Sequence, residues 1–152
     1  MRLELGSGGR PQAGWTHLDI RPDVGADIVD DATVLSKIPD GSCEAIRAAH
    51  ILEHFSWRDT DRILQLWRSK LAKGGRLDIE VPNLTGHIRN WRSALSTDSS
   101  FIEALYGEQD YEHNYHRTGF TADTLHTALD QAGFSLVFVN DIGCVLIGQA
   151  RR

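Results

Sequence analysis

A glycine-rich turn follows the first predicted strand and restricts the folds that this chain can adopt. Residues 2–5 are strand-like, and Gly6-Ser7-Gly8-Gly9 comes directly after them. Glycine has no side chain, so the backbone of such a turn can approach a ligand closely. Only residues 10–15 separate the turn from the next strand-like run, and they include Pro11 and Gly14. That segment is too short for a full helix.

The missing helix argues against ligands that are held by their phosphates. A dinucleotide fingerprint has a third glycine where this chain has Pro11, and a helix then points its N-terminus at the pyrophosphate. A P-loop requires Gly-Lys-Ser or Gly-Lys-Thr after the turn, and the sequence has neither there. The turn therefore favours a ligand without phosphate over NAD, FAD or a nucleoside triphosphate.

Short apolar runs alternate with longer helical patterns along the rest of the sequence. Strands are predicted over residues 2–5, 16–20, 27–29, 44–48, 76–81, 135–139 and 144–149. Helices are predicted over 59–71, 87–95, 101–105 and 122–132, with Gly74-Gly75 ending the first and Thr121 capping the last. This order predicts an α/β fold: a seven-stranded, mostly parallel sheet that ends in an antiparallel hairpin.

Composition and charge set the broad class of the protein. The 152 residues fit a single domain over 1–152, in which the long connection 84–120 is a candidate substrate lid. The net charge of -5 disfavours nucleic acid as a partner. No apolar run reaches the roughly 18 residues of a membrane span, and the first residues contain no apolar signal core. With the two cysteines far apart in sequence, we expect a cytoplasmic protein.

Acidic residues stand near the ends of three consecutive predicted strands. These are Glu4, Asp19 and Asp31, the last beside the small residue Ala32. Ligands of open α/β sheets bind outside such carboxyl ends. S-adenosylmethionine suits these acids, because it carries a net positive charge. Glu4 can favour its ammonium group, Asp19 can accept two hydrogen bonds from the ribose diol, and Asp31 can address the adenine amino group.

Taken together, these segments resemble the class I S-adenosylmethionine-dependent methyltransferases, and more narrowly the short type-11-like group of predicted methyltransferases. The resemblance spans nearly the whole chain. It is carried by residues 3–8 (LELGSG), 14–20 (GWTHLDI), 27–32 (DIVDDA), 50–55 (HILEHF), 71–77 (LAKGGRL), 80–83 (EVPN) and 132–134 (AGF).

The resemblance implies a Rossmann-like sheet of order 3-2-1-4-5-7-6 with the last strand antiparallel, and here with the first helix shortened or absent. It implies S-adenosylmethionine as the cofactor and a small-molecule or sugar acceptor. The implied cofactor contacts are Glu4, Gly6, Ser7, Gly8, Asp19, Ile20, Asp31, Ala32 and His50. Ala72-Lys73 departs from the usual Lys-Pro before the double glycine. The domain is also minimal, so a homodimer or a partner protein is expected to help form the substrate site.

The histidines supply candidate catalytic residues and a competing interpretation. His50-x-x-Glu53-His54 matches an inverted zinc-protease pattern, which predicts a zinc hydrolase if the motif lies on a long helix with a further ligand downstream. The motif directly follows a strand, so we expect no metal. As a methyltransferase, the chain would place His50, His54 and Asn83 at the reaction centre, where a histidine takes a proton from the acceptor. A purely structural role for His54 stays open.

A second polar and aromatic cluster lies in the connection after the fifth strand, at residues 110–116. Within it, Tyr115 and His116 are the predicted substrate residues, together with Glu53 from the histidine motif. A packed or solvated loop is the alternative for this cluster. The sequence therefore predicts a methyltransferase, with a non-catalytic S-adenosylmethionine-binding domain as the main alternative.

Overall fold

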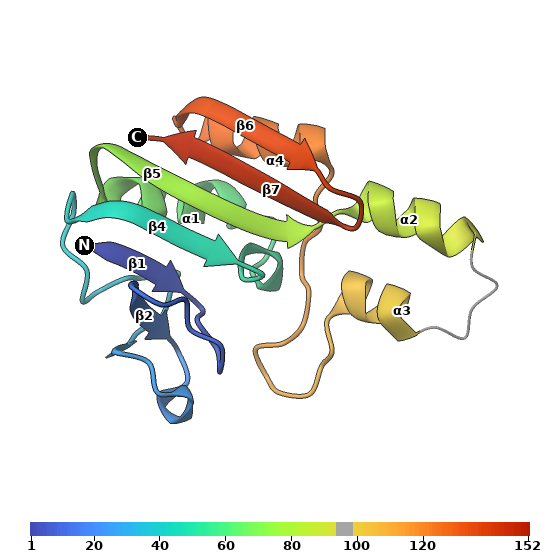
Figure 1. Ribbon diagram of the computed structural model, residues 1–152, viewed down its shortest axis with the longest axis horizontal. Coiled ribbons are helices and arrows are strands. Elements are labelled where there is room, and N and C mark those ends of the chain that lie inside the picture. Colours follow the sequence, from blue (N-terminus) through green and yellow to red (C-terminus); the bar gives the residue numbers. More distant parts are fainter. Residues whose placement is uncertain (94–98) are drawn as a thin grey trace.

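One mixed β-sheet organises the molecule, and the computed structural model describes it for residues 1–93 and 99–152. Within these residues the sheet has seven strands in the order β3-β2-β1-β4-β5-β7-β6 (Figure 1). The strands are β1 (Arg2–Leu5), β2 (Thr16–Asp19), β3 (Ile28–Val29), β4 (Cys43–Ala49), β5 (Leu71–Pro82), β6 (Ser135–Asp141) and β7 (Val145–Arg151). The first five strands pair in parallel, and β7 runs antiparallel to both β5 and β6. The predicted order and the antiparallel last strand are confirmed.

The helices gather on one face of the sheet and beyond its carboxyl ends (Figure 1). The structure forms α1 (Thr60–Lys70), α2 (Leu84–Ser93), α3 (Ser99–Tyr106), α4 (Ala122–Gln131) and the 3-10 turns η1 (Pro22–Val24) and η2 (Leu52–His54). Helices α1 and α4 lie behind the sheet, whereas α2 and α3 project past the end of β5. No helix lies between β1 and β2, where every residue is described, so the absence of the first helix is confirmed.

The other face of the sheet carries no helix in the described part of the chain (Figure 1). The alternation along β5 fits this arrangement: Leu77, Ile79 and Val81 are buried, whereas Asp78 and Glu80 between them are only half-buried. A parallel sheet covered on both faces has strands that are apolar throughout. The alternating pattern therefore belongs to a sheet that is packed on one face only.

Helix α1 fixes the turn after β3 against the core. Its residues Ile63, Leu64 and Trp67 are fully buried. The indole N–H of Trp67 also donates a 2.8 Å hydrogen bond to the carbonyl of Ala32. This bond gives the buried indole a polar partner and fixes the segment after β3 against α1.

The structure corrects where α1 ends and where β5 begins. Strand β5 begins at Leu71 and not at residue 76, so Gly74-Gly75 lie inside it and do not end the helix. Leu71 is already extended, and it pairs with Cys43 of β4 before the register shifts. A side chain on Gly75 would meet the Cys43 carbonyl at 3.1 Å. The double glycine thus allows this irregular pairing.

The other predicted helices also move slightly. Thr121 caps α4 as predicted, and a capping box with Thr124 reinforces it. The helix predicted over 87–95 begins earlier, at Leu84, because Asn83 caps it: the side-chain oxygen of Asn83 accepts from the backbone N–H of Thr85 at 3.1 Å. The last two residues of that prediction lie outside the described residues, as do residues 94–98 of the expected lid.

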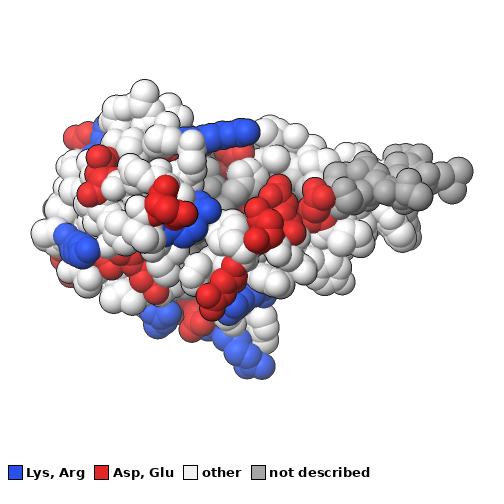
Figure 2. Space-filling view, turned by 90° about the horizontal axis from the view of Figure 1, so that it is seen from below, with Lys and Arg blue, Asp and Glu red and all other residues white. Residues whose placement is uncertain are grey.

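Charged side chains are dispersed over the face shown in Figure 2. Acidic and basic groups are interspersed there with uncharged ones, and the described part of that face shows no continuous basic patch. None of the helices in the described residues has the length and apolar character that would be required to cross a membrane.

Candidate functional site

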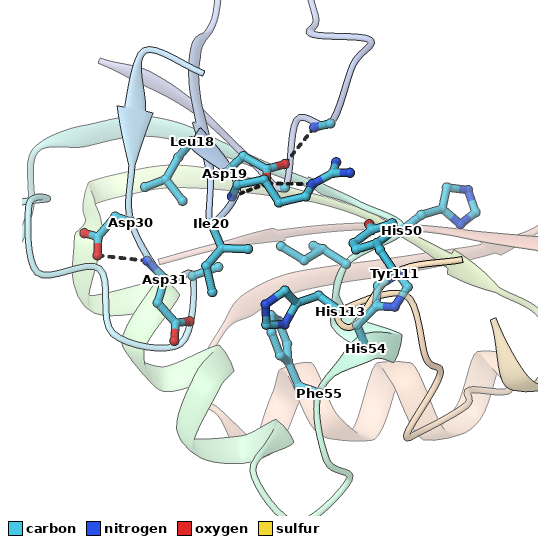
Figure 3. A pocket seen from close by; sticks show the side chains of 15 residues that line it. Leu18, Asp19, Ile20, Asp30, Asp31, His50, His54, Phe55, Tyr111 and His113 are labelled. Atoms are coloured by element: carbon cyan, nitrogen blue, oxygen red, sulfur yellow. Dashed lines mark hydrogen bonds and ion pairs between the residues drawn. The ribbon is translucent and has the colours of Figure 1, made fainter. Parts of the chain in front are cut away.

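A cavity opens at the carboxyl ends of β1, β2, β3 and β4 (Figure 3). It collects most of the predicted cofactor residues: Gly6, Gly8, Asp19, Ile20, Asp31, Ala32 and His50. The predicted catalytic residue His54 also lines it. Seven further residues complete the lining: Leu18, Arg21, Asp30, Ile51, Phe55, Tyr111 and His113. This is the switch region where open α/β sheets hold their ligands.

The glycine turn makes close approach possible at this cavity. Gly6 and Gly8 have φ of +61° and +55°, a conformation that glycine adopts without steric cost. A side-chain carbon on Gly6 would lie 2.6 Å from Cδ1 of Ile51, which lines the same cavity. Ser7, between the two glycines, lies outside the lining and donates its backbone N–H to Leu18 at 3.2 Å. Because Gly6 has no side chain, Ile51 can pack beside the turn and the cavity stays open.

Asp19 ties the glycine turn to the end of β2. Its Oδ2 accepts the N–H of Gly8 at 2.9 Å, and its Oδ1 accepts the backbone N–H and the Nε of Arg21 at 2.9 and 3.3 Å. A carboxylate offers about four acceptor positions. The fold therefore fills three of them, and a bidentate contact with a ribose diol requires the long bond to Arg21 Nε to open.

Arg21 connects Asp19 to the long connection after β5. Its guanidinium lies 4.4 Å from the ring centroid of Tyr111, and both residues line the cavity. The cavity, of about 160 Å³, is smaller than the roughly 300–1,000 Å³ of typical ligand sites. The Arg21–Tyr111 contact forms part of its lining. The sequence predicted substrate contacts for the cluster at residues 110–116, and the structure places two of its members, Tyr111 and His113, at the candidate cofactor cavity.

The two acids after β3 have different surroundings. Asp30 accepts backbone N–H groups of Asp31 and Lys37 at 2.8 and 2.9 Å; burial opposes ionisation, but these bonds lower the pKa of Asp30 overall. Asp31 uses Oδ1 for the N–H and the hydroxyl of Thr33, at 2.7 and 2.8 Å. Both line the cavity, and Figure 3 shows the Asp30 carboxylate turned back toward the backbone of Asp31.

Glu4 is held by its own chain and is not among the residues that line the cavity. It is 2% exposed, and its carboxylate accepts the N–H of Gln12 at 2.7 Å. Its oxygens also lie 3.0 Å from His17 Nδ1 and 2.5 Å from a guanidinium nitrogen of Arg47. Glu4 thus anchors the segment that replaces the first helix. Its predicted contact with the cofactor ammonium stays a prediction that would need a bridging water.

His50 directly follows β4 and has a strained conformation, with φ of +50°. Its two ring nitrogens lie 3.3 Å from Oε1 of Glu53 and 3.1 Å from Oε1 of Glu80. Glu53, and then Glu80, raise the pKa of His50 despite the opposite effect of burial. Burial lowers the pKa of the neighbouring His54. The surroundings of the two histidines beside the cavity therefore shift their pKa values in opposite directions.

A second cavity, of about 450 Å³, adjoins the first and shares His50, His54 and Tyr111 with it. Two of the predicted substrate residues, Glu53 and His116, line this second cavity. The structure thus places a roomier, polar compartment directly beside the candidate cofactor cavity.

Besides Glu4 and Ser7, two further predicted site residues lie outside both cavities. Tyr115 is 43% exposed and lines neither cavity. Asn83 is fully buried; it caps α2 and donates its side-chain N–H to the carbonyl of Gly143 at 2.8 Å. Asn83 therefore joins α2 to the β6–β7 turn, and neither cavity includes it among its lining residues.

The motif His50-x-x-Glu53-His54 does not lie on a long helix. His50 precedes the motif's only regular turn, η2, which covers Leu52–His54. The one-turn spacing that the zinc-hydrolase interpretation requires of His50 and His54 is therefore absent.

The strand order, the antiparallel β7 between β5 and β6, and a cavity at the carboxyl ends of the first four strands define the class I S-adenosylmethionine-dependent methyltransferase fold. No protein-family model matches the sequence, and a comparison with curated proteins finds no match. Comparison with solved structures finds many matches. The three that are described next each cover 99% of this chain.

An S-adenosylmethionine-dependent methyltransferase from Archaeoglobus fulgidus matches with a TM-score of 0.70 at 16% identity, over 99% of this chain and 85% of that chain. The 1,6-didemethyltoxoflavin-N1-methyltransferase of Burkholderia thailandensis, solved with 1,6-didemethyltoxoflavin and S-adenosylhomocysteine, matches at 0.68 and 16% identity, over 99% and 70%. A Haloferax volcanii protein solved with the methyltransferase activator Trm112 matches at 0.68 and 15%, over 99% and 80%. At these identities the similarity establishes the fold.

Proposed function

We propose that this protein is an S-adenosylmethionine-dependent methyltransferase that acts on a small-molecule acceptor. The observation that carries the proposal is the cavity at the ends of β1 to β4, which unites Gly6, Gly8, Asp19 and Asp31. The Burkholderia enzyme of the same fold was solved with the demethylated form of the cofactor bound.

The proposed cofactor position follows the order of the strands. The amino acid portion lies over the Gly6 and Gly8 backbone, the ribose reaches Asp19, and the adenine lies between Ile20 and the Asp31-Ala32 pair. The three lining carboxylates Asp19, Asp30 and Asp31 outnumber the single lining arginine, which favours a cofactor of net positive charge.

Cofactor entry requires the mouth of the cavity to widen. Tyr111 and His113 belong to the connection between α3 and α4, and we propose that residues 84–120 act as the lid. Outward movement of Tyr111 would break its contact with Arg21 and release one acceptor position of Asp19. Closure over the cofactor would then exclude water from the reaction.

The acceptor is proposed to occupy the 450 Å³ cavity, because it shares His50 and His54 with the cofactor cavity. The methyl group would be transferred by direct displacement between the two compartments, with orientation supplying much of the rate. The match to a structure that holds an activator protein motivates a further proposal, that a partner or a second copy completes the acceptor site.

Isothermal titration calorimetry with S-adenosylmethionine and S-adenosylhomocysteine tests the cofactor assignment. We expect saturable binding of both, and no heat at millimolar concentrations of either would refute it. Methyl-labelled cofactor incubated with a metabolite extract then separates an enzyme from a non-catalytic binding domain: an enzyme transfers label to an extract component, and a binding domain does not.

A further inference from the structure

Three potential metal ligands converge at the wall between the two cavities. Glu53 and His54 belong to η2, and His116 belongs to the connection before α4. Each offers one ligand atom, and these atoms all lie within 4.8 Å of one another. The rings of His54 and His116 meet edge to face at 4.9 Å.

The backbone brings these distant segments together. The carbonyl of Glu53 accepts the N–H groups of Arg117 and Thr118 at 2.8 and 3.2 Å. The N–H of His116 donates to the carbonyl of Tyr106 at 3.0 Å. Residues 116–118 are therefore clamped between η2 and the end of α3, and the His116 side chain is presented to Glu53 by main-chain bonds.

The Glu53 carboxylate is buried without a hydrogen bond. It is 1% exposed, and neither of its oxygens accepts a hydrogen bond from the described residues. Its Oε1 has only an ion-pair distance of 3.3 Å to Nδ1 of His50. The Nδ1 of His54 is also buried and without a partner among the described residues. Buried polar groups are nearly always satisfied, and a buried carboxylate is costly unless it is paired or coordinates a metal.

The orientation of His116 is set from behind. Its Nδ1 lies 2.9 Å from the carbonyl of Ala104, so this nitrogen carries the proton and Nε2 keeps its lone pair. Histidines that bind metals typically donate their other ring N–H to a backbone carbonyl or carboxylate, which fixes the ring and the tautomer. The Ala104 carbonyl occupies that supporting position.

We propose that Glu53, His54 and His116 bind a divalent transition-metal ion. Two imidazoles and one carboxylate are a ligand set that suits zinc and its first-row neighbours. Ligand bonds of about 2.0–2.2 Å require the three atoms to draw closer than 4.8 Å, which small rotations of the Glu53 and His54 side chains supply. The set differs from the zinc-protease pattern, because His116 takes the place of His50.

The position of the proposed metal site suggests that the metal would bind a molecule in the second cavity. All three ligands line the 450 Å³ cavity, and three protein ligands leave coordination positions open toward it. An oxygen or nitrogen atom of the bound molecule would fill such a position. If the proposed function holds, that molecule is the methyl acceptor, and the metal would orient its nucleophilic atom beside the cofactor cavity.

Metal titration tests the site without any cofactor, so its outcome is independent of the proposed function. Chelator-stripped protein is titrated with Zn²⁺ by calorimetry and with Co²⁺ by visible absorption. We expect one ion per chain for the wild type. Glu53→Gln and His116→Ala should weaken binding by roughly tenfold or more, since even the loss of a supporting group costs about 10–100-fold. His126→Ala is the matched control, because His126 is exposed on α4 and outside the cluster.

Thermal melting separates loss of the site from loss of the fold. Metal-free Glu53→Gln should still melt cooperatively and close to the wild-type temperature, because glutamine keeps the shape of the side chain, and the loss of the ion pair with His50 is offset by removal of a buried charge that lacks a hydrogen bond. Added Zn²⁺ should raise the melting temperature of the wild type and of His126→Ala but not that of Glu53→Gln. Absence of Zn²⁺ and Co²⁺ binding, or equal binding by Glu53→Gln and the wild type, would overturn the proposal.

Discussion

Replacement of Asp19 separates its two roles, as a structural tie and as a ribose ligand. The Asp19 carboxylate accepts N–H groups from Gly8 and Arg21 and is 5% exposed. In Asp19→Ala these donors lose their acceptor, and each buried, unsatisfied donor costs about 1–3 kcal/mol. Partial access of water at the cavity reduces this cost, so we expect the free energy of unfolding to fall by about 1–3 kcal/mol in total.

Cofactor affinity should fall independently of this loss of stability. A hydrogen bond to a charged group contributes about 1.5–3 kcal/mol. At 1.4 kcal/mol for each tenfold change, Asp19→Ala should weaken S-adenosylhomocysteine binding by roughly 10- to 150-fold. Calorimetry gives the affinity, and urea denaturation of the same preparation gives the stability.

An analogue of S-adenosylhomocysteine with 2′-deoxyribose isolates the ribose contact. The wild type should prefer the natural ligand, and Asp19→Ala should lose most of that preference, because the variant lacks the group that reads the hydroxyl. If Asp19 were only a structural tie, the substitution would weaken both ligands equally. That result, or unchanged affinity for S-adenosylhomocysteine, would refute the placement of the ribose.

Three further substitutions or reactions probe the surroundings of the site. Gly6→Ala should abolish cofactor binding measured by calorimetry, because its φ is +61° and its new carbon would meet Ile51 at 2.6 Å, whereas Gly9→Ala, with no atom within 4 Å, should bind normally. Trp67→Phe should lower the free energy of unfolding in urea by about 1–3 kcal/mol, since it leaves a buried carbonyl without its 2.8 Å donor; an unchanged midpoint would contradict this. Burial raises the pKa of the Cys43 thiol, so iodoacetamide should label this residue at pH 8 only after denaturation, as peptide mass spectrometry can check.

The strand pattern was predictable because it is local. Six predicted strands agree with the structure to within two residues at each end, and the capping of α4 by Thr121 follows from its immediate neighbours. The start of β5 was not predictable in this way. Leu71 is extended because it pairs with Cys43, which lies 28 residues earlier in a different strand. The local helical periodicity includes Leu71 and therefore predicted it as part of the helix.

The open face of the sheet left a signal that the predicted topology did not use. Residues 76–81 alternate between polar and apolar side chains, as expected for a strand with one solvated face. Together with the missing first helix, this alternation would have predicted two layers in place of the usual three. The alternation of polar and apolar residues along a strand thus indicates whether one face or both faces of its sheet are covered.

The glycine turn and the acids at the strand ends were determined by the sequence itself. Gly6 and Gly8 lie within three residues of the end of β1, Asp19 is the last residue of β2, and Asp31 lies two residues after β3. Because parallel strands bring their carboxyl ends to one edge, their meeting in one cavity follows from order alone.

Only the tertiary structure decided what closes and adjoins that cavity. Tyr111 reaches Arg21 from 90 positions away, and His116 reaches Glu53 from 63 positions away. Sequence spacing predicts neither contact, because an irregular connection can approach the sheet at many points. Main-chain bonds such as that from Arg117 to Glu53 select one of them, and they form only once the sheet and its helices have packed.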